Sequence, residues 1–239
     1  MNPRFHFPGI LPHAGDVELP AAAAHHALKV LRLADGDAVT LFDGSGGELE
    51  ARLAVRARTA YAVAGRWRET GRESPFAIVL VQALVGGDKM DWAIQKAVEL
   101  GVAGIVPLQA ARSVPRLAGV RADKRLEHWR QVVVAACEQC GRNRPPFVAP
   151  VRTLAAYLDQ RDAAMRLIFA PGGARLSTLL PLAAPVHLLV GPEGGWSEEE
   201  RALCLRSGCR ETGLGPRVLR TETAGLVAIA VLQAAGGDF

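Results

Sequence analysis

A glycine-rich segment in the last quarter of the chain contains the first residues that could hold a ligand. It reads Val190-Gly191-Pro192-Glu193-Gly194-Gly195-Trp196-Ser197 and lies between an apolar run and a helical pattern. Glycines at the end of a strand let a ligand approach the backbone closely, and open α/β sheets bind ligands at that edge. A tight turn alone needs one or two glycines, so this pattern favours a binding site. Ser197 with Glu200 predicts a capping box that begins the next helix.

A second segment combines a glycine turn with charged residues at the predicted start of a helix. It reads Leu214-Gly215-Pro216-Arg217-Val218-Leu219-Arg220-Thr221-Glu222-Thr223-Ala224. Thr221 suits the N-cap position, and Glu222 suits the first turn, where a carboxylate meets the positive end of the helix dipole. Arg220 has no such explanation, because a cation at a helix N-terminus is unfavourable unless it has a ligand or partner. We therefore expect Arg220 to face an anion.

Strands and helices that could position these two segments alternate from residue 76 onward. Apolar runs predict buried strands, and helical patterns followed by glycine predict helices. The predicted strands are 76–85, 103–108, 166–170 and 186–190, and the predicted helices are 91–100, 124–140, 197–207 and 222–235. This alternation predicts an α/β domain with a mostly parallel sheet that is covered on both faces.

The N-terminal part of the chain has a different pattern. A glycine-rich turn separates the runs 38–42 and 48–55, which predicts a hairpin. Residues 19–33 show a short helical pattern, and the polar stretch 65–75 is typical of a linker. We therefore expect two domains, 1–72 and 73–239.

Composition excludes several classes of protein. The chain has 239 residues, of which 49% are hydrophobic and 22% charged, so it can bury a sizeable core and does not resemble a disordered protein. No apolar stretch reaches the ~18 residues that a membrane span requires, and the N-terminus has no signal-peptide pattern. We expect a cytoplasmic protein that does not bind membranes.

The positive charge is concentrated in one part of the chain. Residues 1–73 hold nine basic and nine acidic residues, so the net charge of +4 arises entirely from residues 74–239. The segment 112–144 holds eight basic residues against three acidic ones. Such a segment could attract a polyanion, although a solvated helix face and a loop would produce the same composition.

Several common site motifs are missing. The chain has no G-x-G-x-x-G, no G-x-x-x-x-G-K-[ST] and no G-x-S-x-G, which argues against a standard dinucleotide site, an ATP site and a serine hydrolase. Four cysteines are too few for a disulfide scaffold, and the spacings of Cys137 with Cys140 and of Cys204 with Cys209 differ. Buried thiols explain them better than a zinc or redox site does, so we expect no metal.

Taken together, the two loop segments resemble the cofactor-binding loops of the SPOUT RNA methyltransferases. They are most similar to those of the RsmE family, whose members methylate N3 of a uridine in the 16S RNA of the small ribosomal subunit. Three further segments agree with that family: Gly87-Asp88-Lys89-Met90-Asp91-Trp92 leading into 95–101, Ala136-Cys137-Glu138-Gln139-Cys140-Gly141-Arg142, and 26–32. The resemblance covers nearly the whole chain, and its motifs occur in the family's order.

The resemblance implies a fold that general topology rules would not predict, since knots are very rare. It implies a small PUA-like RNA-binding β-barrel, followed by a SPOUT α/β domain with a C-terminal trefoil knot. It also implies a homodimer that binds S-adenosylmethionine in the knot. Backbone around the cofactor would come from Val190, Gly191, Pro192 and Gly195, and Leu214, Gly215, Val218 and Leu219 would hold adenine and ribose. The remaining cofactor residues implied are Leu189, Glu193, Arg217, Thr221, Thr223 and Ala224.

Methylation at N3 of uracil requires specific chemistry. The N3–H is weakly acidic and lies on the base-pairing edge, so the base must be unpaired, deprotonated and aligned with the methyl donor. Cations or N–H donors near O2 or O4 would stabilise the anion, and Arg220 is the best candidate for this role. Glu222 and Glu138 compete as proton acceptors. No metal is required.

The resemblance and the basic segment together suggest which residues contact RNA. They are Arg4, Lys29, Arg32, Arg112 and Arg142. Three alternatives remain. A ribose 2′-O methyltransferase of the same superfamily typically carries Ser-Leu-Asn in the final motif, where this chain has Arg220-Thr221-Glu222-Thr223. A non-catalytic RNA-binding protein would not need the cofactor loops, and a nucleotide-dependent dehydrogenase would need a phosphate-binding motif.

Overall fold

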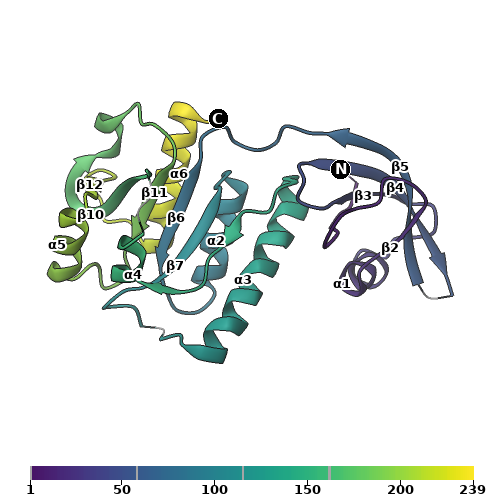
Figure 1. The fold of residues 1–239 in the computed structure, drawn as a ribbon, viewed down its shortest axis with the longest axis horizontal. Helices are drawn as coiled ribbons and strands as arrows, with labels where there is room; N and C mark the ends of the chain where they lie inside the picture. Colours follow the sequence, from purple (N-terminus) through teal and green to yellow (C-terminus); the bar gives the residue numbers. More distant parts are fainter. Residues whose placement is uncertain (1, 58, 115, 161–162) are drawn as a thin grey trace. The chain divides into compact units, whose positions relative to one another are not determined.

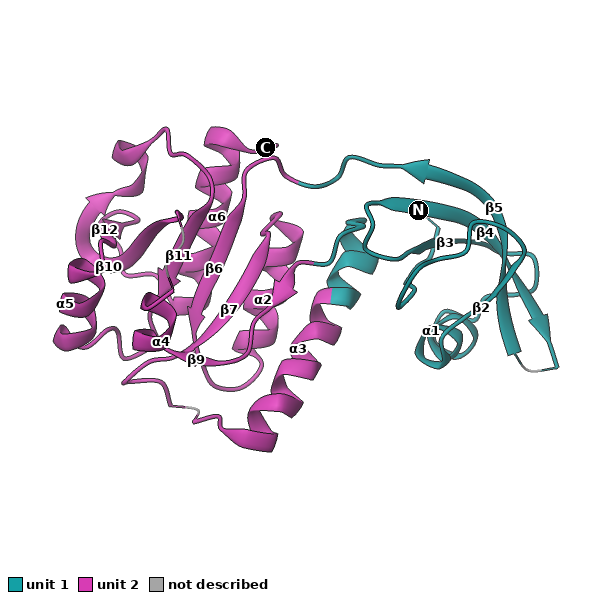
Figure 2. Cartoon of the chain, in the orientation of Figure 1, with its two compact units in different colours: residues 1–73, 134–145 teal, residues 74–133, 146–239 magenta. Residues whose placement is uncertain are grey.

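The computed structural model describes residues 2–57, 59–114, 116–160 and 163–239. Figure 2 shows that the chain forms two compact units. Unit 1 contains residues 1–73 and 134–145, and unit 2 contains residues 74–133 and 146–239. The expectation of two continuous domains therefore needs a correction, because residues 134–145 belong with the N-terminal unit. They comprise the last turns of a long helix and the loop after it, and their sequence pattern does not reveal which unit they pack with.

Unit 1 is built on a five-stranded sheet in the order β1-β3-β4-β5-β2. Its elements are β1 (Arg4–His6), β2 (Asp16–Glu18), α1 (Ala21–His25), the π-helical turn η1 (His26–Val30), β3 (Ala38–Phe42), β4 (Gly47–Arg56) and β5 (Thr59–Glu69). Strands β3 and β4 pair antiparallel, which confirms the predicted hairpin, whereas β1 pairs parallel with β3. The helix predicted over 19–33 is present as α1 and η1.

The core of unit 1 follows from the alternation of its strands. Val39 and Leu41 of β3 lie in the same hydrophobic cluster as Leu49 and Leu53 of β4. Alternate residues of a strand point to one face, so these side chains meet on the same side of the sheet. The helical turn adds Ala27, which is fully buried. The helix therefore covers one face of the unit 1 sheet.

Unit 2 is a parallel sheet in the order β12-β10-β11-β6-β7-β8, with a short strand β9 also paired to β7. Its strands are β6 (Ile78–Ala83), β7 (Gly104–Gln109), β8 (Phe147–Val148), β9 (Arg152–Thr153), β10 (Met165–Arg175), β11 (Val186–Val190) and β12 (Arg210–Gly213). The four predicted strands are confirmed as β6, β7, β10 and β11. The other three are too short or too polar to stand out in the sequence.

Six helices accompany this sheet in the described part of the chain. They are α2 (Lys89–Glu99), α3 (Gly119–Cys140), α4 (Leu154–Leu158), the 3₁₀ helix η2 (Leu176–Leu179), α5 (Glu198–Arg206) and α6 (Thr221–Gly236). The four predicted helices are present as α2, α3, α5 and α6, although α3 begins at Gly119 rather than at residue 124. Helix α5 begins with the predicted capping box of Ser197 and Glu200.

Helices cover both faces of the unit 2 sheet (Figure 1). Gly225 of α6 lies so close to Leu80 of β6 that an added Cβ would approach that side chain to 2.9 Å. Val79 and Val81 point to the other face and share a core with residues of α4 and α5. Because the strands are parallel, the loops after β6, β11 and β12 gather at one edge of the sheet. No helix among the described residues is long and apolar enough to cross a membrane.

Candidate functional site

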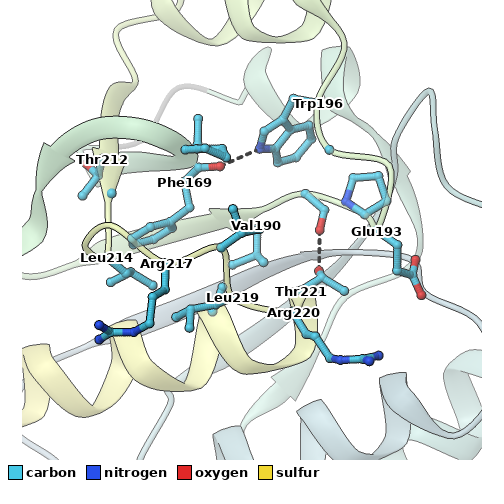
Figure 3. A pocket seen from close by; sticks show the side chains of 18 of the residues that line it. Phe169, Val190, Glu193, Trp196, Thr212, Leu214, Arg217, Leu219, Arg220 and Thr221 are labelled. Carbon is cyan, nitrogen blue, oxygen red and sulfur yellow. Dashed lines mark hydrogen bonds between the residues drawn. The ribbon is translucent and has the colours of Figure 1, made fainter.

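The loops that follow β11 and β12 line a single cavity of about 800 Å³ in unit 2. Figure 3 shows Glu193 from the first loop and Leu214, Arg217 and Arg220 from the second around this space. The volume lies within the range of small-molecule sites, about 300–1,000 Å³. The parallel sheet therefore brings together the two segments that the sequence singles out.

Most of the expected cofactor residues line this cavity. They are Val190, Gly191, Pro192, Glu193, Gly195, Leu214, Gly215, Arg217, Val218, Leu219, Thr221 and Ala224, and Arg220 and Glu222 line it as well. Leu189 is fully buried in the core and is not among the lining residues. Thr223 is also not among the lining residues, and its N–H donates to the Arg220 carbonyl. Cofactor contacts by Leu189 and Thr223 stay predictions.

The start of helix α6 is tied to the first loop through Thr221. Its hydroxyl donates to the carbonyl oxygen of Gly191 and accepts a hydrogen bond from Nε2 of Gln82 at 3.0 Å. The prediction that Thr221 is the N-cap is wrong: Arg220 is the N-cap, and Thr221 is the first residue of α6. Gln82 is a fully buried residue that sequence reasoning missed. Its only signal is a single amide within an otherwise apolar strand.

An indole ring supports the same loop. Nε1 of Trp196 donates to the carbonyl oxygen of Phe169 at 3.1 Å. A Cβ added to Gly191 would come within 3.1 Å of this indole, so any larger residue there would press on the ring. Gly215 has a φ of +113°, which side-chain-bearing residues rarely adopt. Gly191 therefore leaves room for the indole ring, and Gly215 allows the backbone conformation of the second loop.

The cavity presents charged groups whose hydrogen bonds are incomplete. The side chain of Arg220 is exposed at the N-cap of α6. Oε2 of Glu222 is buried, and within the described part of the chain nothing hydrogen-bonds to it. Leaving a buried polar atom unpaired costs about 1–3 kcal/mol. A bound group that completes this hydrogen bond would remove that cost.

A further charged pair lies at the same cavity. Nζ of Lys89, the first residue of α2, lies 3.0 Å from Oε1 of Glu193. Partial burial opposes ionisation of Glu193, but the hydrogen bond from Lys89 outweighs it and the pKa of the carboxyl is lowered. Sequence reasoning did not select Lys89 as a site residue. The sequence feature that could have identified it is its position directly after a Gly-Gly-Asp turn at the end of a strand.

Two of the residues expected to contact RNA are buried inside unit 1. Arg4 forms an ion pair with Glu48 at 2.5 Å and a hydrogen bond with Asn143. Arg142 forms an ion pair with Glu73 at 2.6 Å. The two arginine side chains are only 3% and 8% exposed. The structure therefore corrects this expectation and gives both guanidinium groups a role in the packing of unit 1.

The other expected RNA contacts, Lys29, Arg32 and Arg112, are exposed. Nη1 of Arg112 also donates to the carbonyl oxygen of Gly194 at 2.9 Å, so this side chain touches the loop that lines the cavity. Glu138, the alternative proton acceptor, lies in unit 1. There it accepts a hydrogen bond from the His6 N–H at 3.0 Å, and burial raises its pKa.

The cysteines carry no sign of a metal site. Cys137, Cys204 and Cys209 are buried and Cys140 is half-buried, which confirms the interpretation of three of them as buried thiols. Burial raises the pKa of Cys137 to about 12, so this thiol stays protonated at neutral pH. The described residues contain no group of three or more histidine, cysteine, aspartate or glutamate side chains that could hold a metal ion.

Comparison with known proteins covers both parts of the chain. The model of an RNA methyltransferase domain matches residues 72–233, and the model of an RNA methyltransferase PUA domain matches residues 19–62. Ribosomal RNA small subunit methyltransferase E of Bacillus subtilis is 32% identical over 220 residues, which cover 87% of this chain and 86% of that protein. The protein of the same name from Mycobacterium tuberculosis is 33% identical over 233 residues, with 92% and 87% covered.

Solved structures match over the full length. The ribosomal RNA small subunit methyltransferase E of Neisseria gonorrhoeae, crystallised with S-adenosyl methionine, is 40% identical with a TM-score of 0.92 and covers 100% of both chains. A methyltransferase of Legionella pneumophila in complex with the cofactor SAM is 37% identical with a TM-score of 0.95, again over 100% of both chains.

Proposed function

Because this chain belongs to the family of ribosomal RNA small subunit methyltransferases E, we propose that it methylates N3 of a uridine in 16S ribosomal RNA with S-adenosylmethionine. One observation carries the proposal. A single cavity is lined by the two glycine-containing loops, by an exposed arginine and by a buried carboxylate oxygen that has no hydrogen-bond partner among the described residues. The two loops suit the binding of a cofactor. The arginine and the carboxylate suit a uracil ring that must lose its N3 proton.

The residues of the cavity fit S-adenosylmethionine. Phe169, Val190, Leu214 and Leu219 offer apolar surface for an adenine ring, and the backbone at Gly215 leaves open space, since a Cβ there would meet nothing within 4 Å. Carboxylates and guanidinium groups that line the same space match the ammonium and carboxylate groups of the cofactor's amino-acid part. When bound, this cofactor supplies an electrophilic methyl group on a positively charged sulfur.

Arg220 and Glu222 divide the remaining work. The N3–H proton of uracil passes to a base while the N3 lone pair forms the new bond to the methyl carbon, and the electrons of the broken carbon–sulfur bond stay on sulfur. Glu222 is the proposed proton acceptor, because its Oε2 has no other hydrogen bond to make among the described residues. Arg220 stabilises the negative charge that spreads onto the uracil oxygens, as a cationic hydrogen-bond donor beside the bound base.

The RNA footprint is proposed for the exposed basic residues Lys29, Arg32 and Arg112. Phosphate contacts by such side chains supply affinity without sequence preference, and that affinity falls as salt rises. Since 16S RNA and its subunit are cytoplasmic, we place the protein in the cytoplasm. In this proposal, RNA contacts outside the cavity select the uridine that is methylated.

A homodimer and a knotted backbone complete the proposal. Val227 and Val231 of α6 are only partly buried and line a second, smaller cavity beside Leu214, so this apolar face suits a second copy of the chain. The knotted backbone is proposed because the two cavity loops resemble those of the SPOUT methyltransferases and the chain belongs to this family of RNA methyltransferases. Light scattering of the purified protein tests the dimer, and a monomer at micromolar concentration would refute it.

Methyl transfer to small subunits isolated from cells that lack this enzyme tests the activity. The expected product is 3-methyluridine at one position of 16S RNA, detected by mass spectrometry of nucleosides and located by primer extension. Ribose-methylated uridine would replace the proposal with 2′-O methylation. No product in the presence of tight RNA binding would favour a non-catalytic RNA-binding protein.

A further inference from the structure

Two cations at the cavity each lie at the start of a helix. Lys89 is the first residue of α2, and Arg220 is the N-cap of α6, and both line the same space. The positive end of a helix dipole repels a cation, so each position weakens its own helix unless something negative lies nearby. Their shared location indicates a shared anionic ligand.

The ion pair with Glu193 does not by itself explain Lys89. Both side chains of this pair are more than one third exposed, at 39% and 38%, and pairs of this kind contribute little to stability. Glu193 lies on the loop after β11 and lines the same cavity as Arg220 (Figure 3). The pair therefore holds the lysine ammonium at the cavity that Arg220 also lines.

We propose that Lys89 is a second substrate-binding cation, which acts beside Arg220 to stabilise the uracil ring as it loses the N3 proton. This inference rests on the proposed function. Glu193 positions Lys89 between turnovers, and the flexible four-carbon stem of lysine lets the ammonium turn from the carboxylate toward a uracil oxygen. Two donors are useful because the charge of the anion is shared between O2 and O4, which lie on opposite sides of N3.

The diagnostic property is the pH dependence of the chemical step. A cation near uracil favours its anionic form, so it lowers the pKa of the N3–H group in the complex. Lys89→Met removes this effect, and the rising part of the pH–rate profile then moves to higher pH. The other charged side chains that line the cavity stay in place: Arg201, Arg217, Arg220, Glu193 and Glu222.

A matched pair of variants tests the proposal in single-turnover methyl transfer. Lys89→Met should lower the rate at neutral pH on the order of 10-fold, less than the loss for a fully enclosed donor because Lys89 is half exposed. Lys96→Met is the control, since Lys96 lies on the same helix and pairs with Glu99 at 2.8 Å away from the cavity residues. It should leave rate and profile unchanged, and Lys89→Arg should retain much of the activity.

Substrate RNA with 5-fluorouridine at the target position provides an independent readout. Fluorine makes N3–H more acidic, so less help from the enzyme is needed and the deficit of Lys89→Met should shrink. Affinities for S-adenosylmethionine by calorimetry and for RNA by filter binding should stay within about twofold of the original enzyme.

Three results would overturn the inference. One is an unshifted pH profile with no fluorouridine rescue. Another is weaker RNA binding with a normal rate at saturation, which would make Lys89 a phosphate contact. The third is a lower melting temperature as the only change, which would make it structural. If the unaltered enzyme forms no 3-methyluridine, the proposed function itself has failed, and that result is read before any variant.

Discussion

The polar residues of unit 1 and those of the unit 2 cavity differ in how completely they are hydrogen-bonded. In unit 1, Glu48 accepts from Arg4 at 2.5 Å, from Arg72 at 3.0 Å and from Asn143 at 3.4 Å. In the cavity, Oε2 of the half-buried Glu222 is itself buried but has no partner among the described residues. The same residue type is thus satisfied in one place and unsatisfied in the other.

This difference teaches how the two regions use charge. A completed network removes the cost of burying charged groups and makes each member necessary for packing. An incomplete one lowers stability, and it persists where a ligand completes it. We therefore expect substitutions in the first region to change stability and substitutions in the second to change activity.

The largest effect is expected for Glu48→Gln. The change leaves the Arg4 guanidinium, 3% exposed, without a charged partner, and breaking a buried pair in this way costs about 3 kcal/mol. Denaturant unfolding measures it, and Glu50→Gln is the control. Glu50 lies on the same strand but pairs with Arg68 at the surface, so its loss should cost less than about 1 kcal/mol. Equal effects at both positions would contradict the assignment.

Acid titration sharpens the same test. Burial raises the pKa of Glu48, but the hydrogen bond and charge of Arg4 outweigh it, so the folded pKa lies below the ordinary value of 4.5. The carboxylate therefore contributes stability above its unfolded pKa, and this contribution is lost as pH falls through the folded pKa. As pH falls from the unfolded pKa to the folded pKa of Glu48, the free energy of unfolding of the original protein should decrease more steeply than that of the Glu48→Gln variant.

The next largest effect is expected for Arg220→Ala. Loss of a well-placed donor should lower the methyl-transfer rate on the order of 10²-fold or more, with melting temperature and most cofactor affinity retained. Arg220→Lys should rescue little, because a point charge lacks the planar donor fork. Arg206→Ala, an exposed change outside the cavity, is the control. A near-normal rate for Arg220→Ala would contradict the proposed catalytic role of Arg220.

A smaller effect is expected for Arg112→Ala. Loss of one phosphate contact should weaken RNA binding by a few-fold and reduce its salt slope by about 1. Arg112 also donates to Gly194, so cofactor affinity should fall slightly as well. Arg142→Met is the contrast: its guanidinium is buried against Glu73, so the salt slope should stay unchanged while stability falls. A reduced slope for Arg142→Met would mean that Arg142 does reach RNA.

The smallest effect is expected for Glu138→Gln. Burial raises the folded pKa of Glu138, so the protonated form is favoured and stability is lost as pH rises through that pKa. The neutral amide avoids this loss and can still accept from the His6 N–H. Above the folded pKa the variant should therefore be more stable by less than about 1 kcal/mol, since part of the group meets solvent. At acid pH the two proteins should be equal.

Local patterns were enough to predict the elements around the cavity. Apolar runs marked β6 and β11, the glycine turns marked both loops, and the capping box marked the start of α5, whereas the N-cap of α6 is Arg220 and not the predicted Thr221. These features depend on residues that are close in the chain, so the types of the side chains are enough to predict them. The short strand β12 reads Arg-Glu-Thr-Gly and owes its place to pairing with β10, so no local pattern could predict it.

The sequence by itself singled out the two loops that line the cavity, because turn chemistry and helix capping are local. Only the tertiary structure decided which polar side chains remain available to a ligand. As arginines, Arg4 and Arg142 are of a residue type that often contacts RNA, yet they form ion pairs with Glu48 and Glu73 inside unit 1. Lys89, in contrast, enters the cavity only because parallel strands place the loops after β6 and β11 at one edge. Hydrogen-bond satisfaction depends on groups far apart in the chain, so it is a property of the fold.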